Sequence, residues 1–259
     1  MKHLKINALL NRWKTEKILK SILFVQILIN MGSPYYPKWV TIILPVLTVL
    51  EICLLLLFYL IIPKIEKDIL DNIELEVLER YIARIESHHF RGKKKNYYLI
   101  KLSSYYYIFG KFDYSIILLK EVDFSKLPSG SYSVLDYYFQ AYISRLKMKN
   151  WDKLENIKQS FLAYKSNKLS EYKKKQYYMN YMEIFEKLFI KKSEVSNLLL
   201  AEDTAYDYIR KHYFLAINAL NKQDSNMARK EFQKLSRYSE KLFMVKEAKE
   251  WLETNKIND

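Results

Sequence analysis

The longest apolar stretch in the chain runs from Val40 to Ile62, and Glu51 is its only charged residue. The hydrocarbon core of a bilayer is about 30 Å thick, and roughly 20 apolar helical residues are needed to cross it. Seventeen of these 23 residues are Leu, Ile, Val or Phe, which favours insertion by about 5 to 10 kcal/mol. A central acid costs roughly 3 kcal/mol. The pattern therefore predicts a membrane-spanning helix over 40–62.

A weaker apolar segment, residues 18–36, precedes this helix. Its apolar stretch from Ser21 to Met31 is too short to cross a bilayer alone. Lys20 can reach the headgroups at one end, and the aromatic residues at positions 35, 36 and 39 favour the interface at the other. Gly and Pro residues in the connection between the two segments are typical of a tight reversal. We therefore predict a transmembrane helical hairpin over 18–63.

The basic residues are concentrated outside this hairpin. Residues 1–17 form a basic tail, Lys64 and Lys67 follow the second helix, and the turn carries one charge. Lys and Arg favour the cytoplasmic side, so we predict two spans in the cell membrane with both termini in the cytoplasm. Two alternatives stay open. In the first, residues 1–31 are a cleaved signal peptide, although no small-x-small cleavage pattern follows Met31. In the second, residues 1–31 lie flat in the membrane interface and only the second helix spans, which would place the large domain outside.

Gln26 and Glu51 are predicted to lie at nearly the same depth in the membrane. About ten residues separate Gln26 from Tyr36 and about eleven separate Glu51 from Val40, at 1.5 Å per helical residue. One interpretation is an intramembrane polar pair that holds the hairpin together. The other is that Glu51 contacts another membrane protein or lines an ion path. The second interpretation needs an oligomer or a partner, because two helices are too few to enclose a path.

Residues 64–95 are predicted to form a connecting helix that ends in a basic loop. The apolar positions Leu75, Leu78, Ile82 and Ile85 have helical spacing. In the loop from His88 to Lys95, the adjacent histidines have no acidic or Cys partner at ligand spacing, so no metal site is expected. The basic side chains of this loop are candidates for contact with anionic lipid headgroups, namely Arg91, Lys93, Lys94 and Lys95.

Residues 96–128 keep helical spacing on either side of a turn at 109–113. The segment resembles a tetratricopeptide repeat. The resemblance implies that the small residues Ser103 and Ser115 let two helices approach, that Gly110 makes the turn, and that Tyr106 and Phe112 fill the space between the helices. The matching positions are Leu99, Leu102, Ser103, Tyr106, Gly110, Phe112, Ser115, Leu119, Val122 and Pro128.

Two further segments resemble the same repeat. Residues 212–235 place Ala216 and Ala228 at the two small positions, and residues 138–161 place Tyr142 where a small residue is expected. We also predict a helix over 177–200 and a closing helix over 239–252. Only four glycines occur in the chain, which favours helices. The predicted fold class is all-α, with a transmembrane helical hairpin followed by a TPR-like antiparallel helix-pair solenoid over 96–259.

The sequence contains no motif that indicates catalysis. It has no Gly-rich phosphate loop, no His-Glu-x-x-His and no nucleophile elbow. Cys53 is the only cysteine, so a disulfide within the chain is impossible. We therefore expect a protein that is not an enzyme and that uses no cofactor and no metal.

Tyrosine clusters are the remaining conspicuous feature, and they have two explanations. The first is packing inside the solenoid. The second is an amphipathic, basic groove in which outward rings beside lysines bind a peptide or a partner helix. The predicted groove residues are Tyr98, Lys101, Tyr105, Lys111, Tyr138, Lys173, Lys174 and Tyr178.

These patterns together predict a membrane-anchored, non-enzymatic adaptor that presents its helical domain at the cytoplasmic face of a bacterial membrane. Its expected partners are membrane lipid, an unidentified protein or peptide, and a second copy of the chain. One alternative is an accessory or immunity subunit of a membrane transport or export system that acts through the hairpin. A membrane-tethered RNA-binding domain ranks lower: tyrosine rings and lysines suit RNA, but no RNA-binding motif is present, so nucleic acid is not an expected partner.

Overall fold

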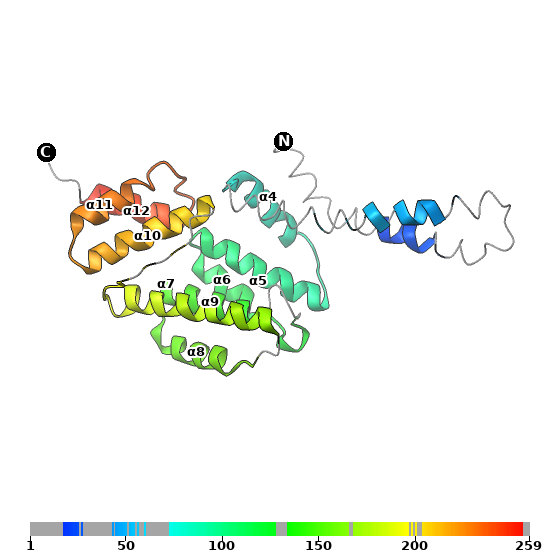
Figure 1. The fold of residues 1–259 in the computed structure, drawn as a ribbon, viewed down its shortest axis with the longest axis horizontal. Coiled ribbons are helices and arrows are strands. Elements are labelled where there is room, and N and C mark those ends of the chain that lie inside the picture. The colour runs from blue at the N-terminus through cyan, green and yellow to red at the C-terminus, as the bar shows by residue number, and fades with distance from the viewer. Residues whose placement is uncertain are drawn as a thin grey trace. The chain divides into compact units, whose positions relative to one another are not determined.

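The computed structural model describes residues 18–25, 27, 43, 45–50, 52–54, 56, 60, 73–127, 134–165, 168–196, 198, 200 and 204–255. These residues form helices and connecting segments, and they contain no β-strand (Figure 1). The all-α prediction is therefore confirmed for the described part of the chain. The chain divides into two compact units, residues 1–84 and 85–259, which are described separately.

In the first unit, residues 18–25, 45–50 and 52–54 are helical. Leu19 and Leu23 are half-buried, and every other described Ile, Leu, Val and Phe between positions 18 and 60 is exposed. No helix within the described residues is both long enough and apolar enough to cross a bilayer. Gln26, Glu51 and the predicted turn between the two spans lie outside the described residues.

The connecting segment contains helix α4 (Leu75–Glu86), which falls within the predicted helix. Its apolar positions recur every three or four residues, so they lie on one face of the helix. Val77, Leu78, Tyr81, Ile82 and Ile85 on that face are each at most 7 % exposed. The predicted continuation over 64–72 lies outside the described residues.

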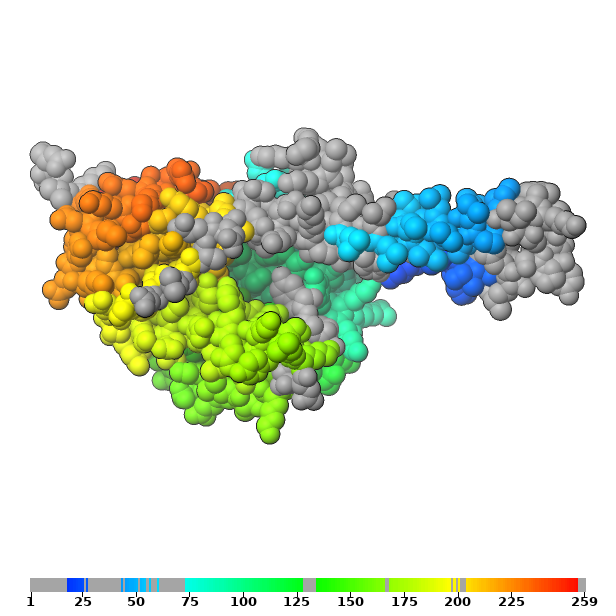
Figure 2. All heavy atoms as spheres, viewed as in Figure 1, coloured from blue at the N-terminus to red at the C-terminus, as the bar shows by residue number. Residues whose placement is uncertain are grey.

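The second unit contains three pairs of consecutive helices joined by short turns. Within each pair the two helices pack against each other, α9 packs on α7, and α12 packs on α10 and α11. In Figure 2 the atoms of α7–α9 and of α10 form a continuous surface. The elements are α5 (Gly92–Ile108), α6 (Phe112–Lys120), η2 (Phe124–Lys126), α7 (Val134–Lys147), η3 (Trp151–Lys153), α8 (Leu154–Ala163), α9 (Leu169–Phe185), the π-helical turn η4 (Glu186–Ile190), α10 (Ala205–Asn221), α11 (Ser225–Gln233) and α12 (Phe243–Thr254).

The first pair, α5–α6, is the helical hairpin predicted for 96–128. Gly110 makes its turn with a φ of +71°, a left-handed conformation that favours glycine. The side chains of Ser103 and Ser115 are fully buried and hydrogen-bonded at 2.8 Å. Ser115 also lies 2.8 Å from Ser144 of α7, so small side chains mark the closest approach of three helices.

Two details of this region differ from the sequence prediction. The predicted loop over 88–95 is shorter, because α5 begins at Gly92 and includes the three lysines; lysine has a good helix propensity, and the apolar register of α5 follows directly. The second detail concerns Tyr106, which is only half-buried. Its ring stacks on Tyr114 of α6, and its hydroxyl donates to Glu86, while Phe112 packs against Tyr107 of α5.

The last pair, α10–α11, coincides with the predicted repeat at 212–235. Ala216 and Ala228, at the predicted small positions, are both fully buried. Gln223 takes the left-handed conformation that glycine provides in the first pair, with a φ of +62°. Asp224 then begins α11, because its side chain accepts a hydrogen bond from the backbone N–H of Met227.

The helix predicted over 177–200 ends early, so that prediction is wrong beyond Ile190. The chain leaves η4 and passes through Lys192, whose φ is +48°. The side chain of Asn218 then holds the segment in place of helical bonds: its Oδ1 accepts from the N–H of Val195 at 2.9 Å, and its Nδ2 donates to the carbonyl of Val195 at 3.1 Å.

Candidate functional site

A cavity of about 170 Å³ lies among α5, α7, α9, α10 and α12. The first helix of each pair contributes to it, and the second helices α6, α8 and α11 contribute no lining residue. Stacked helix pairs form extended concave surfaces that can bind partners. This cavity is therefore the best candidate for a functional site in the described part of the second unit.

On four of the five helices, all except α12, lining side chains recur four residues apart. Examples are Phe139 and Ile143 on α7, Tyr181 and Phe185 on α9, and the run of Tyr206, Arg210 and Phe214 on α10. Residues four apart lie on the same helical face, so each of these helices presents one stripe of side chains to the cavity. The sequence analysis missed these residues, although the i, i+4 recurrence of aromatic residues on successive helices is visible in the sequence.

The walls of the cavity are largely aromatic. Phe185 and Phe214 make an edge-to-face contact, with 5.2 Å between ring centroids. Phe139 lies nearly parallel to Tyr178, with 4.1 Å between their centroids and an interplanar angle of 3°. Met244 of α12 completes the wall and is 2 % exposed. These rings lock one another in place, so the cavity is held by packed side chains.

Arg210 is the charged group of the cavity. One terminal nitrogen of its guanidinium donates to Oδ1 of Asp207, and its Cζ lies 4.9 Å from the ring centroid of Tyr181 and 5.9 Å from that of Tyr206. Burial disfavours its charge, but the neighbouring tyrosines and Asp207 outweigh burial and raise the pKa of Arg210. Its buried Nε has no hydrogen-bond partner among the described residues. The guanidinium is thus charged and oriented but incompletely paired.

Two tyrosine hydroxyls accompany this guanidinium. Burial raises the pKa of Tyr107 well above its usual value, and the charges of Tyr206, Glu247 and Arg210 also act on it. Burial, opposed by Arg210 and assisted by Asp207, raises the pKa of Tyr206 to about 12. Both phenols are therefore protonated at neutral pH and able to donate. Neither hydroxyl has a hydrogen-bond partner in the part of the chain that the structure describes.

Several other polar groups in or beside the cavity have partners. Ser104 donates to the carbonyl of Lys101 at 2.7 Å. The amide of Gln140 donates to Ser144 at 3.2 Å. Asp207 accepts from Arg210 through Oδ1 and from the hydroxyl of Thr204 through Oδ2, at 2.8 Å. Arg210 can only donate, whereas the tyrosine hydroxyls and the Oε1 of Gln140 can also accept hydrogen bonds.

The structure places the predicted groove residues of α5 mainly inside the fold. Tyr98, Lys101 and Tyr105 are 5 %, 1 % and 2 % exposed. The ammonium of Lys101 lies 5.9 Å from the ring centroid of Tyr105. Lys111 is exposed in the turn before α6, with its ammonium 5.5 Å from the ring of Tyr106.

The remaining groove residues lie on α7 and α9. Lys174 and Tyr178 both bind Asp136 of α7, each at 2.6 Å. Tyr138 is half-buried and packs against Phe124, whereas Lys173 is exposed. Among the eight predicted residues, the structure therefore brings Lys174 and Tyr178 together around one carboxylate, in a contact that joins α9 to α7.

The basic run before α5 is accessible. Arg91, Lys93, Lys94 and Lys95 are all exposed, and Lys95 forms an ion pair with Glu121 at 3.1 Å. Contact of these side chains with lipid headgroups stays a prediction.

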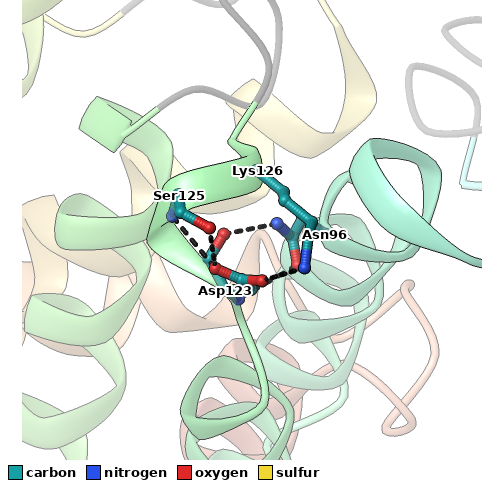
Figure 3. A network of polar contacts seen from close by, with 4 residues as sticks. All are labelled: Asn96, Asp123, Ser125 and Lys126. Carbon is teal, nitrogen blue, oxygen red and sulfur yellow. Dashed lines mark hydrogen bonds and ion pairs between the residues drawn. The ribbon is translucent and has the colours of Figure 1, made fainter.

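Several polar networks outside the cavity hold helices together. Asn96 of α5 donates to the carbonyl of Asp123 at 2.6 Å and accepts from its N–H at 3.1 Å, as Figure 3 shows. The buried pair of His212 and Glu231 joins α10 to α11 at 2.5 Å. Lys147 reaches Glu247 of α12 at 2.8 Å. Within the described residues no group of three His, Cys, Asp or Glu side chains is arranged to hold a metal ion.

The second unit thus contains an aromatic cavity that is lined by one charged side chain, Arg210. No family model matches this chain, and comparison with curated proteins and with solved structures found nothing similar to it.

Proposed function

We propose that this protein is a membrane-anchored, non-enzymatic adaptor that binds a protein or peptide segment through its helix-pair domain at the cytoplasmic face of a bacterial membrane. The observation that carries the proposal is the cavity among the first helices of the pairs. It combines aromatic walls with the guanidinium of Arg210 and the hydroxyls of Tyr107 and Tyr206. Binding sites typically combine an apolar lining with a few placed polar groups.

The arrangement of helices supports a binding role. The pairs α5–α6, α7–α8 and α10–α11 follow one another along the chain, and the tetratricopeptide resemblance is carried by serines or alanines at the close approaches of the first and last pairs. Solenoids built from such pairs provide an extended surface for partners.

The exposed apolar side chains of the first unit support the membrane anchor. Phe24, Val46 and Leu60 are 62 %, 63 % and 72 % exposed. Soluble monomers rarely expose large contiguous apolar patches, so such surfaces favour contact with a membrane or another protein. Together with the apolar length of 40–62 and the excess of Lys and Arg outside the predicted turn, they favour the two-span hairpin.

The same exposed side chains also favour a second candidate function, an accessory or immunity subunit of a membrane transport or export system. In that case the hairpin, with Gln26 and Glu51, is the binding element and the helical domain is secondary. The two functions differ in which part of the chain retains the partner.

Proximity labelling of the intact protein in its native cell identifies the neighbours, and three variants then locate the contact. We expect the neighbours to survive the double change Gln26→Leu and Glu51→Leu, and to be lost on deletion of residues 96–252. Ser104→Phe, which fills the cavity, is expected to lose the same neighbours as the deletion. If the neighbours are lost in the hairpin variant and retained after the deletion, the adaptor proposal is overturned and the second candidate is supported.

A further inference from the structure

The cavity also indicates the chemistry of its ligand, an inference that rests on the proposed adaptor function. We propose that it binds a peptide segment in which an aromatic side chain is next to an Asp or Glu. The ring enters the aromatic cavity, and the carboxylate accepts hydrogen bonds from Arg210, Tyr107 and Tyr206.

The size of the cavity selects one ring. Its volume is about 170 Å³, and an apolar protein cavity of about 150 Å³ is known to hold one benzene molecule. A partner helix is about 10 Å across, so it cannot enter. The cavity therefore accepts one side chain of a ligand, with the rest of the ligand outside.

The walls favour an aromatic ring over an aliphatic side chain. Phe139, Phe185 and Phe214 present ring faces and edges, and Met244 contributes a thioether. Offset and edge-to-face ring pairs add about 0.5–1.5 kcal/mol beyond the burial of their area, and sulfur–ring contacts also stabilise. A ligand ring would extend the existing edge-to-face contact of Phe185 and Phe214.

The polar end of the cavity favours an anionic acceptor. The Nε of Arg210 is buried with no acceptor among the described residues. The hydroxyls of Tyr107 and Tyr206 line the same cavity and can each donate a hydrogen bond. Both oxygens of Asp207, the carboxylate beside them, are already used. Arg210 lines the cavity with a guanidinium that holds Asp207 through one terminal nitrogen. A carboxylate bound by the remaining guanidinium donors would form a strong, oriented hydrogen bond.

The position of these donors favours a carboxylate on a neighbouring residue of the same chain as the ring. Since one ring takes up the cavity, the acid must approach from its edge, next to Arg210. Consecutive residues of a peptide supply both groups on one backbone, which agrees with the proposed capture of a peptide segment. The net charge of +14 on the whole chain also favours an acidic partner.

Calorimetric titration of the full chain in lipid nanodiscs with blocked dipeptides tests the proposal. The probe is acetyl-Glu-Phe-amide, and its controls are acetyl-Gln-Phe-amide, which lacks the charge, and acetyl-Glu-Ala-amide, which lacks the ring. We expect each control to bind at least about 10-fold more weakly, which corresponds to about 1.4 kcal/mol. Equal affinity for the Glu and Gln probes, or tighter binding of free 3-phenylpropionate than of the dipeptide, would overturn it.

Variants locate the binding. Arg210→Met is expected to weaken the Glu-Phe probe by at least about 10-fold and to leave the Gln-Phe probe unchanged. Arg145→Met is the matched control, because Arg145 of α7 also has a buried Nε without a partner but does not line the cavity. Ser104→Phe is expected to abolish binding of both probes. Binding that survives Ser104→Phe would place the probe elsewhere and contradict the inference, even if Arg210→Met fails to fold.

Failure of this inference is distinguishable from failure of the adaptor function. If the helical domain retains its neighbours in cells and the dipeptides bind without preference, the ligand chemistry is wrong and the adaptor proposal stands. If the neighbours depend on the hairpin alone and no dipeptide binds, both are wrong.

Discussion

At the residue scale, Gly110 connects the turn of the first helix pair to α12. Its φ of +71° is one that other L-residues rarely adopt, and a Cβ placed on it would lie 2.8 Å from the Cβ of Phe243. The ring of Phe243 in turn packs against Tyr107 and Phe112. A side chain at position 110 would therefore disturb both the turn and the contact with the last helix.

Gly110→Ala is expected to destabilise the protein by about 1–3 kcal/mol, because backbone strain and the close contact add. Gly92→Ala is the matched control: Gly92 has a φ of +57°, but a Cβ there meets nothing within 4 Å. We expect the control to cost less than Gly110→Ala, about 1–2 kcal/mol, because only the left-handed backbone strain acts there. Thermal unfolding followed by circular dichroism measures both, and an equal cost for the two variants would show that the contact with Phe243 is unimportant.

Asp123 organises the connection after α6. Its carboxylate accepts from the N–H and hydroxyl of Ser125 and pairs with Lys126 at 2.6 Å, while Asn96 pairs with its backbone (Figure 3). Hydrogen bonds from Lys126 and Ser125 lower the pKa of Asp123 to about 2. An ordinary Asp has a pKa of about 3.9, so the ionised carboxylate stabilises the folded state.

The sign of the pH dependence follows from this lowered pKa. The stabilisation is fully present above about pH 4 and is lost as the pH falls toward 2. Asp123→Asn is therefore expected to be less stable than the unmodified protein at pH 6, with the difference shrinking between pH 4 and 2. The urea concentrations at the unfolding midpoint, measured across this pH range, give the difference in stability between the two proteins. Asp152→Asn, at an exposed position, is the control. A difference that stays constant with pH would contradict the role of the charge.

At the element scale, three buried serines fix the approach of α5, α6 and α7. Ser115 lies 2.8 Å from Ser103 and 2.8 Å from Ser144, and all three are fully buried. Each small side chain lets backbones come close, and the shared hydrogen bonds satisfy the buried hydroxyls. The helices therefore have little room for a larger side chain here.

Ser115→Leu is expected to cost about 1–3 kcal/mol or more by overpacking, and Ser115→Ala about 1 kcal/mol by the loss of hydrogen bonds. The exposed Ser160→Leu on α8 is the control and should change stability by less than about 0.5 kcal/mol. Chemical denaturation of the three variants measures the free energy of unfolding of each and so ranks their stabilities. If Leu at position 115 is tolerated as well as Ala, the helices do not approach as closely as described.

The element scale also shows what the sequence could predict. Local signals located the two pairs at 96–128 and 212–235, because small residues, helical spacing and turn residues all agree there. They could not show that Ser144, two residues after the expected position Tyr142, makes the close approach to α6. That choice depends on contacts between pairs: Tyr142 instead donates to Glu186 at 2.9 Å, which no spacing within α7 indicates.

The candidate site was harder to predict for the same reason. Tyrosine and lysine positions suggested a groove, but Lys174 and Tyr178 are used on Asp136, and Lys101 is buried. A sequence pattern does not show which charged side chains find partners inside the fold. Arg210 forms an i, i+3 ion pair with Asp207, and its incomplete pairing becomes visible only when the side chains around it are placed.

At the scale of the whole molecule, contacts far apart in sequence join the helix pairs of the second unit. Lys147 at the end of α7 binds Glu247 of α12 and the hydroxyl of Tyr213 of α10, and its ammonium lies 4.9 Å from the ring centroid of Phe243. Burial lowers the pKa of Lys147, while Glu247 opposes the shift. This cluster joins α7, α10 and α12, which are three of the five helices that surround the cavity.

The membrane anchor leads to the last prediction, which concerns the whole chain. We expect the protein to stay in the membrane fraction after carbonate extraction, because the exposed apolar side chains at 18–60 lose contact with water only in a bilayer or against another apolar surface. Reporter fusions at Asp259 and within the predicted turn at 32–39 test the topology. The hairpin predicts a cytoplasmic reporter at Asp259 and an external one in the turn. An external reporter at Asp259 would support a single span over 40–62 and would place the helical domain, with its cavity, outside the cell. A protein released by carbonate would instead show that these apolar side chains contact another protein.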